Sequence, residues 1–109
     1  MLCHYDNTFI FGDFNINLLD TESCATKFLF NNIIEPFDFK QLVTEPTRVT
    51  DTSSTLLDLI LASNPNSVKM VGIADLPGIS DHSMVYMACS IKKPKYQPKT
   101  IWIRDYSKF

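Results

Sequence analysis

Residues 56–61 read LLDLIL, an apolar run that carries one carboxylate, Asp58, in its middle. A short apolar run that follows a loop rich in Thr, Ser and Asp is typical of a β-strand, and the loop TEPTRVTDTSS precedes this one. A lone carboxylate in such a strand is costly to bury unless a cation or an N–H group pairs with it. Asp58 therefore either faces water from a half-exposed strand or has a partner elsewhere in the chain.

Apolar stretches on both sides of LLDLIL predict further strands. Residues 8–11 (TFIF) are β-branched and aromatic and run into Gly12, which indicates a buried strand. Residues 39–43 (FKQLV), 67–74 (SVKMVGIA) and 83–91 (SMVYMACSI) predict three more strands. We expect the later strands to be antiparallel in part.

Residues 21–34 predict a helix, because their apolar residues recur at the spacing of one helical face. Thr21 or Ser23 is the expected N-cap, and Pro36 ends the helix. One helix among several strands predicts the α/β class. The apolar positions of the predicted face are Ala25, Phe28, Leu29, Ile33 and Ile34.

The composition is typical of one globular domain or a part of one, with 45% apolar and 20% charged residues among 109. Residues 1–91, the expected folded body, hold four basic and eleven acidic side chains, a net charge of −7. Residues 92–109 hold six basic side chains and one acidic, a net charge of +5, and their prolines predict an extended linker. An acidic body binds nucleic acid poorly by itself, but carboxylates that hold a cation reverse the local field.

The sequence gives no sign of a membrane span or a secretion signal. No apolar run approaches about 20 residues, and the start MLCHYDNTFIFGD lacks a basic leader followed by an apolar segment. We therefore expect an intracellular protein. Cys3, Cys24 and Cys89 are widely spaced, which argues against a disulfide framework or a zinc site. We expect reduced thiols, with Cys24 and Cys89 packed inside.

Two motifs place polar residues at the ends of predicted strands. In FIFGDFN (9–15), Asp13 and Asn15 either form an ordinary turn, which these residue types favour, or hold a carboxylate and an amide over a phosphate. In SDH (80–82), His82 follows Asp81 at the start of the last strand. A carboxylate bonded to one imidazole nitrogen fixes the tautomer and favours the charged ring, whereas a lone histidine is more often structural or exposed.

These groups are expected to meet at one end of the sheet, because ligands bind where strand ends converge. We expect Asp58 to hydrogen-bond to His82 and to raise its pKa. Oxygen ligands suit Mg²⁺, or Mn²⁺ in its place, and Mg²⁺ keeps several waters and a substrate phosphate in its shell. The expected site comprises Asp13, Asn15, Asp58, Asp81 and His82.

The motifs GDFN, LLDLIL and SDH, in this order, resemble those of the endonuclease/exonuclease/phosphatase superfamily. The sequence EPTR before LLDLIL, followed by GISDHSMVY, is similar to motifs of the endonuclease domain of non-LTR retrotransposons. The resemblance spans about residues 8–91. It implies the second half of a two-sheet α/β sandwich, the DNase-like fold, with a mixed sheet and at least one flanking helix.

The resemblance also implies a role for each site residue. Asp13 would orient and deprotonate the attacking water, and Asn15 would steady the nucleophile and the phosphate. Asp58 would pair with the active-site histidine, His82, which stabilises charge on the scissile phosphate. Asp81 would lie near the metal, with Asp13 as a second ligand.

Two more residues lie in these motifs, Arg48 and Ser80, and either could contact the substrate phosphate. A solvated loop arginine is an equal alternative for Arg48. The implied partners are DNA as substrate and a downstream reverse-transcriptase domain in the parent protein, and the implied compartment is the nucleus.

The resemblance also implies a metal-binding glutamate, an early asparagine and a catalytic tyrosine before GDFN. Glu22, Glu35 and Glu45 all follow GDFN and do not match that glutamate. We therefore expect a Mg²⁺-dependent DNA endonuclease fragment that is weak or inactive alone. Two alternatives stay open: a non-catalytic remnant that only binds a partner, and a phosphoesterase of the same superfamily that acts on a small phosphoester.

Overall fold

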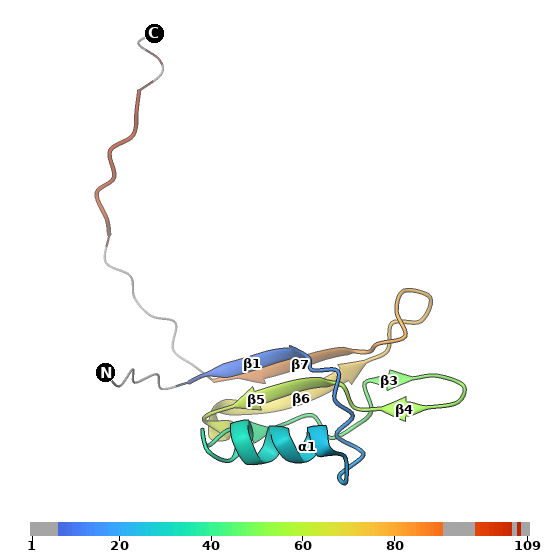
Figure 1. The fold of residues 1–109 in the computed structure, drawn as a ribbon. Coiled ribbons are helices and arrows are strands. Elements are labelled where there is room, and N and C mark those ends of the chain that lie inside the picture. The colour runs from blue at the N-terminus through green and yellow to red at the C-terminus, as the bar shows by residue number, and fades with distance from the viewer. Residues whose placement is uncertain (1–6, 91–97, 106, 108–109) are drawn as a thin grey trace.

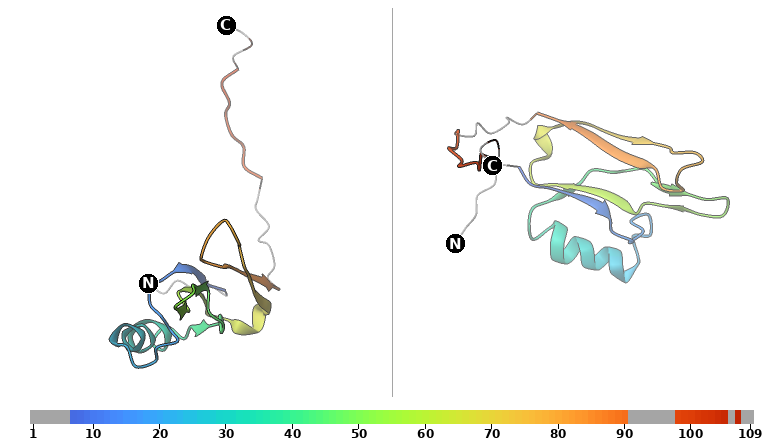
Figure 2. Two further views of the ribbon diagram at one scale, coloured as in Figure 1. Left: turned by 90° about the vertical axis from the view of Figure 1, so that its right-hand side faces the viewer. Right: turned by 90° about the horizontal axis from the view of Figure 1, so that it is seen from above.

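The chain folds around a three-stranded antiparallel sheet, with a short helix on one side and a two-stranded ribbon on the other (Figure 1, Figure 2). The computed structural model describes residues 7–90, 98–105 and 107. The central sheet has the order β1-β5-β2, while β3 pairs with β4 and β6 with β7. In chain order the elements are β1 (Phe9–Asp13), α1 (Cys24–Leu29), the π-helical turn η1 (Phe30–Ile34), β2 (Lys40–Gln41), β3 (Arg48–Val49), β4 (Ser54–Thr55), β5 (Asp58–Ala62), the 3₁₀ turn η2 (Pro65–Ser67), β6 (Val68–Ala74) and β7 (Met84–Cys89).

Strand β5 is the central strand, and both of its faces are covered. Residues 59–62 are each at most 1% exposed, although successive side chains of a strand point to opposite faces. The helix α1 lies against one side of the sheet, and the ribbon β6–β7 lies on the other side (Figure 2). A strand covered on both faces is apolar at every position, which explains why LLDLIL lacks alternation after Asp58.

The hydrophobic core connects these three layers. On the ribbon, two cross-strand pairs pack against it: Val71 opposite Met87, and Ile73 opposite Val85. Burial of such side chains stabilises the fold by about 25 cal/mol per Å² of apolar surface. The buried members of the core are Leu18, Leu29, Ile34, Val43, Leu56, Leu59, Ile60 and Leu61.

Strand β1 is present, but the prediction that it is buried is wrong. Ile10 is 37% exposed and Phe11 is 53% exposed. The strand lies at the edge of the central sheet, with β5 as its hydrogen-bonded neighbour, so the helix and the ribbon cover it incompletely. The rings of Phe9 and Phe11 lie 6.3 Å apart and shield each other instead of entering the core.

The sequence prediction missed the hairpin formed by β3 and β4, which it treats as a loop. Arg48 pairs with Thr55 and Val49 pairs with Ser54. The turn is closed by the amide of Thr50, which donates to the carbonyl of Ser53. Strands of two residues are too short to show apolar periodicity, so nothing in the local pattern indicates them.

The prediction of a mixed sheet is also wrong, because every pairing among the described strands is antiparallel.

The predicted helix is confirmed as α1 followed by η1, but its buried face is shifted. Ser23 is the N-cap, and its Oγ accepts a hydrogen bond from the amide of Thr26. Thr26 is buried, while Ala25 and Phe28, which were expected on the apolar face, are exposed. Thr26 can face inward because its hydroxyl donates to the carbonyl oxygen of Asn17, which satisfies the buried polar group.

Two further expectations concern the cysteines and the tail. Cys24 is exposed and Cys89 is half-buried, so the prediction that both pack inside is wrong for Cys24. Cys24 is the first residue of α1 and lies on its outer face, and Cys3 lies outside the described residues.

Residues 98–105 of the tail are exposed and form no helix or strand, and residues 92–97 are outside the described residues. Within the described parts of the chain, no helix is long and apolar enough to cross a membrane.

Replacing Ser23 by alanine should destabilise the chain by about 1 kcal/mol, because the substitution removes the N-cap hydrogen bond of α1. Urea unfolding followed by circular dichroism measures this difference in the free energy of unfolding. Thr21, the other residue that the sequence offered as N-cap, is exposed, and Thr21→Ala should change the stability by less than about 0.5 kcal/mol. A larger loss in Thr21→Ala than in Ser23→Ala would contradict the assignment of the cap.

Candidate functional site

Two carboxylates face each other at one end of the central sheet. Asp13, the last residue of β1, is the direct cross-strand partner of Asp58, the first residue of β5. Directly opposed side chains of antiparallel strands lie on the same face of the sheet, and like charges in these positions destabilise the pair. The arrangement therefore favours a cation beside the two carboxylates.

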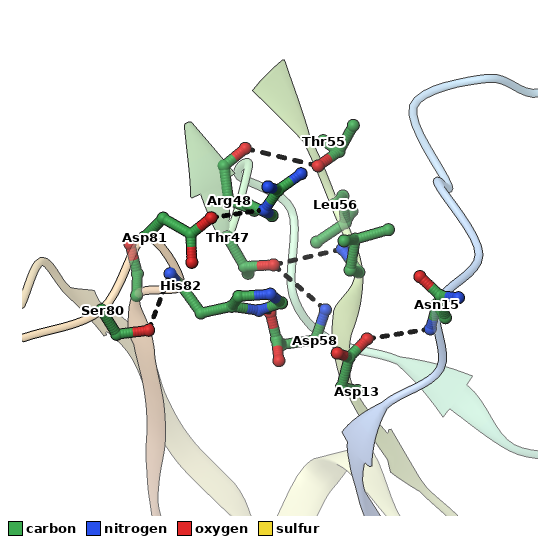
Figure 3. Close-up of polar contacts among 12 residues, drawn as sticks. Asp13, Asn15, Thr47, Arg48, Thr55, Leu56, Asp58, Ser80, Asp81 and His82 are labelled. Carbon is green, nitrogen blue, oxygen red and sulfur yellow. Dashed lines mark hydrogen bonds and ion pairs between the residues drawn. The ribbon is translucent and has the colours of Figure 1, made fainter. Parts of the chain in front are cut away.

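His82 provides a positive charge at this position. It lies in the loop before β7, and its Nδ1 is 2.9 Å from Oδ2 of Asp58 (Figure 3). Because an ionised carboxylate only accepts hydrogen bonds, Nδ1 is the donor. The predicted contact between Asp58 and His82 is thus present. Ligand atoms of Asp13, Asp58 and His82 all lie within 4.8 Å of one another.

The surroundings raise the pKa of His82 above its ordinary value of 6.5. The hydrogen bond that His82 donates to Asp58 is the largest cause, and the negative charges of Asp58, Asp13 and Asp81 add to it. Partial burial of the ring lowers the pKa and opposes these effects. The charged imidazolium is therefore favoured beside the two carboxylates.

Asp13 forms a turn with Asn15 and also belongs to the group of Asp13, Asp58 and His82. Oδ1 of Asp13 accepts a hydrogen bond of 2.9 Å from the backbone amide of Asn15 (Figure 3). Asn15 has a φ of 52°, a left-handed conformation that asparagine tolerates better than most residues. The turn fixes one oxygen of the Asp13 carboxylate and leaves the other free. The alternative of an ordinary turn is thus confirmed for FIFGDFN, and a contact of Asp13 and Asn15 with a phosphate stays a prediction.

Asp81 is not part of the cluster around Asp13 and Asp58. Its Oδ2 lies 2.8 Å from Nε of Arg48, and the side chains of Arg48 and Asp81 are 38% and 53% exposed. The hydrogen bond from Arg48 is the largest cause that lowers the pKa of Asp81. Asp81 lies in the bend just before His82, and the backbone bridge between Arg48 and His82 brings the guanidinium of Arg48 next to it. Its role as a metal ligand stays a prediction.

Ser80 holds the loop that carries His82 through a hydrogen bond within that loop. Its Oγ accepts a hydrogen bond of 3.0 Å from the backbone amide of His82. Arg48 forms an isolated antiparallel bridge with His82 as well as its ion pair with Asp81. The predicted residues Arg48 and Ser80 therefore lie beside the histidine, and a contact of either with phosphate stays a prediction.

An open cleft of about 210 Å³ lies in front of the two carboxylates. Its walls come from β1, from the start of β5 and from the start of β7, so residues far apart in the sequence line it together. The lining residues are Phe11, Gly12, Asp13, Asp58, Leu59, Ser83 and Val85. The acidic groups of the site are thus accessible to a ligand.

The donor set fits a hard divalent cation. Mg²⁺ is usually bound by one or two carboxylates, with water and substrate phosphate completing its shell. Asp13 and Asp58 provide the carboxylates, while Nδ1 of His82 is occupied by Asp58. No glutamate joins this group among the residues that the structure describes.

The sequence prediction missed two buried contacts that support the site. Thr47 is fully buried, and its hydroxyl accepts hydrogen bonds from the amides of Leu57 and Asp58. Oδ1 of Asn17 accepts a hydrogen bond from the amide of Leu56. Both residues lie in polar loop sequence, where no periodicity distinguishes a buried residue from a solvated one.

Replacing Asp58 by asparagine should lower the pKa of His82, because the substitution removes both the ionic hydrogen bond and a nearby negative charge. Titration of the ring resonances by NMR measures this pKa. Asp51→Asn is the matched control, since Asp51 is exposed in the β3–β4 turn and should leave the pKa of His82 unchanged. An equal pKa in the chain and in Asp58→Asn would mean that the pair does not form in solution.

The stability of the chain should fall as the pH rises through the pKa of His82. A folded pKa above 6.5 means that the native state binds the proton more tightly than the unfolded state. The contribution is therefore fully present below pH 6.5 and is lost above the folded pKa. Urea unfolding of the chain and of His82→Gln across this range measures the difference. A stability difference that grows with pH would contradict this sign.

Searches of protein-family models, curated proteins and solved structures found no match to this chain. The resemblance to the endonuclease/exonuclease/phosphatase superfamily thus rests on the three short motifs alone. The function proposed below depends on those motifs and on the positions of Asp13, Asp58 and His82.

Proposed function

We propose that this chain provides the water-activating and charge-stabilising part of a Mg²⁺-dependent phosphodiesterase site that cleaves DNA. The observation that carries the proposal is the pair formed by Asp58 and His82 directly beside the carboxylate of Asp13. A histidine that is only structural or only solvated would not need two opposed carboxylates beside it at an open cleft. The order of the motifs GDFN, LLDLIL and SDH supports the same reaction class.

Asp13 is the group that accepts a proton from the attacking water. Its side chain is exposed at the cleft, and the Asn15 amide holds one of its two oxygens. The second oxygen can accept a proton from a water placed for in-line attack on phosphorus. Fixing one oxygen keeps the other in a constant position, which reduces the entropy lost during the reaction.

His82 stabilises the negative charge that develops on the phosphate. Its Nδ1 donates to Asp58, so Nε2 is the ring nitrogen that can donate to a phosphate oxygen. The raised pKa favours the charged form of the ring, and a fixed positive charge stabilises a developing negative charge best when it is already oriented. Asp58 orients the ring and compensates its charge.

A bound Mg²⁺ ion would supply Lewis-acid neutralisation of the phosphate charge. Asp13 and Asp58 are the residues of this chain that would hold it. In the related enzymes that the motifs resemble, a glutamate before GDFN completes the metal site. The chain alone would therefore be a weak nuclease, and a longer parent protein with a reverse-transcriptase domain would act on DNA in the nucleus.

Nicking of supercoiled plasmid DNA in the presence of Mg²⁺ tests this function. The chain alone should nick slowly, and a version extended upstream of GDFN should nick rapidly. Asp13→Ala and His82→Gln should lower the rate by about 10²-fold or more in the longer version, because each removes a group that acts on the reacting atoms. Robust nicking by the 109-residue chain that Asp13→Ala abolishes would show that the chain needs no further ligand.

The matched control is Glu35→Ala. Glu35 is an exposed carboxylate that follows η1 and precedes β2, whose Lys40 pairs with Ala62 at the opposite end of β5 from Asp58. This variant should nick like the unchanged protein. Nicking that is equal in the Asp13→Ala, His82→Gln and Glu35→Ala variants would overturn the proposal, as would an extended version without Mg²⁺-dependent cleavage.

A further inference from the structure

We propose that Thr47 is a positioning residue that fixes the distance between Asp58 and His82. This inference rests on the proposed function, because it gives Thr47 a role in the same site. Thr47 lies between the strand that carries Asp58 and the loop that carries His82 (Figure 3). It contacts both through hydrogen bonds, and it reaches neither the cleft nor the reacting groups.

On the side of β5, the Thr47 hydroxyl holds the backbone at the start of the strand. Its Oγ1 accepts two hydrogen bonds, from the amide of Leu57 at 3.1 Å and from the amide of Asp58 at 3.0 Å. A hydroxyl oxygen has two lone pairs, so one side chain can accept both bonds. Thr47 is 0% exposed, and water therefore does not compete for these amides. The position of the Asp58 Cα is set by this oxygen.

On the side of β7, the main chain of the same residue holds the loop. The carbonyl oxygen of Thr47 accepts a hydrogen bond of 2.6 Å from the amide of Ser83, the residue after His82. The next residue, Arg48, forms the antiparallel bridge with His82. The amide of Thr47 donates to the carbonyl of Thr55 in β4. One buried residue thus ties together the three segments that meet at the site.

The side-chain oxygen, and not only the volume of Thr47, is needed for this role. Valine has nearly the same shape, but it would leave the Leu57 and Asp58 amides without an acceptor inside the protein. An unsatisfied buried amide is costly, so the backbone there would shift towards another acceptor or towards water. A shift at Asp58 would lengthen the 2.9 Å contact with His82. Serine keeps the oxygen and should preserve the contact.

The test compares Thr47→Val with Thr47→Ser and reads the hydrogen bond between Asp58 and His82 directly. An imidazole Nδ1–H that donates to a carboxylate gives a proton NMR resonance far downfield at a pH where the ring is charged. We expect this resonance in the unchanged chain and in Thr47→Ser, and its loss in Thr47→Val. In the longer nuclease, Thr47→Val should lower kcat to the level of Asp58→Asn.

Thr26→Val is the matched control for loss of a buried hydroxyl. Thr26 is 3% exposed and its hydroxyl donates to the Asn17 carbonyl, in the helical layer. Thr26→Val should reduce stability while the His82 resonance persists. Persistence of the resonance in folded Thr47→Val would overturn the proposal, because the residue would then be only structural. If Thr47→Val does not fold, loss of the resonance in folded Thr47→Ser would overturn it.

The NMR readout does not depend on catalysis. If the version extended upstream of GDFN cleaves no DNA while the chain keeps the resonance pattern expected for Thr47→Val and Thr47→Ser, the proposed nuclease function is contradicted and the positioning role of Thr47 stays intact. Cleavage with a resonance that is unaffected by Thr47→Val would contradict the positioning role alone.

Discussion

The hydrogen bond between Asp58 and His82 joins the central sheet to the β6–β7 ribbon at their polar end. Asp13 and Asp58 are directly opposed across two strands, so a positive charge beside them reduces an unfavourable pairing. Because the histidine comes from the segment before β7, the contact that balances this charge also fixes how the two sheets meet. Charge balance and sheet packing therefore depend on the same three side chains.

Strand β5 takes part in both the polar site and the hydrophobic core, at different positions along its length. Its first residue, Asp58, belongs to the polar site, and the four that follow are buried in the core. The fully buried residues hold the strand in place, and Thr47 holds its first amide. A polar cluster can therefore lie at the edge of the core without a loss of order, since the backbone beneath it is fixed from two sides.

The ion pair between Arg48 and Asp81 has a different character from the pair of Asp58 and His82. Both of its side chains are accessible to solvent, and an ion pair in contact with water contributes little to stability and is screened by salt. Its effect is local, because it keeps Asp81 away from the carboxylate cluster and holds the guanidinium next to the loop of His82. The cluster is thereby limited to two carboxylates and one histidine.

Local patterns were sufficient to predict α1 with its cap at Thr21 or Ser23, the strands β1, β5, β6 and β7, and the pairing of Asp58 with His82. These features follow from apolar spacing and from the cost of an unpaired buried carboxylate, which the sequence displays directly. The exposure of β1, the hairpin β3–β4 and the burial of Thr47 could not be predicted, since each depends on contacts with residues distant in the sequence.

The two neighbours Asp81 and His82 show this limit most clearly. The sequence by itself determined that Asp81 and His82 are neighbours in the loop before a strand, and it predicted that His82 pairs with Asp58, but it also placed Asp81 in the same site. The structure confirms that His82 pairs with Asp58, 24 residues away, but only the tertiary structure decided that Asp81 pairs with Arg48, 33 residues away. The physical reason is that Arg48 forms a backbone bridge with His82 once the chain has folded, which brings the guanidinium of an arginine distant in the sequence next to Asp81.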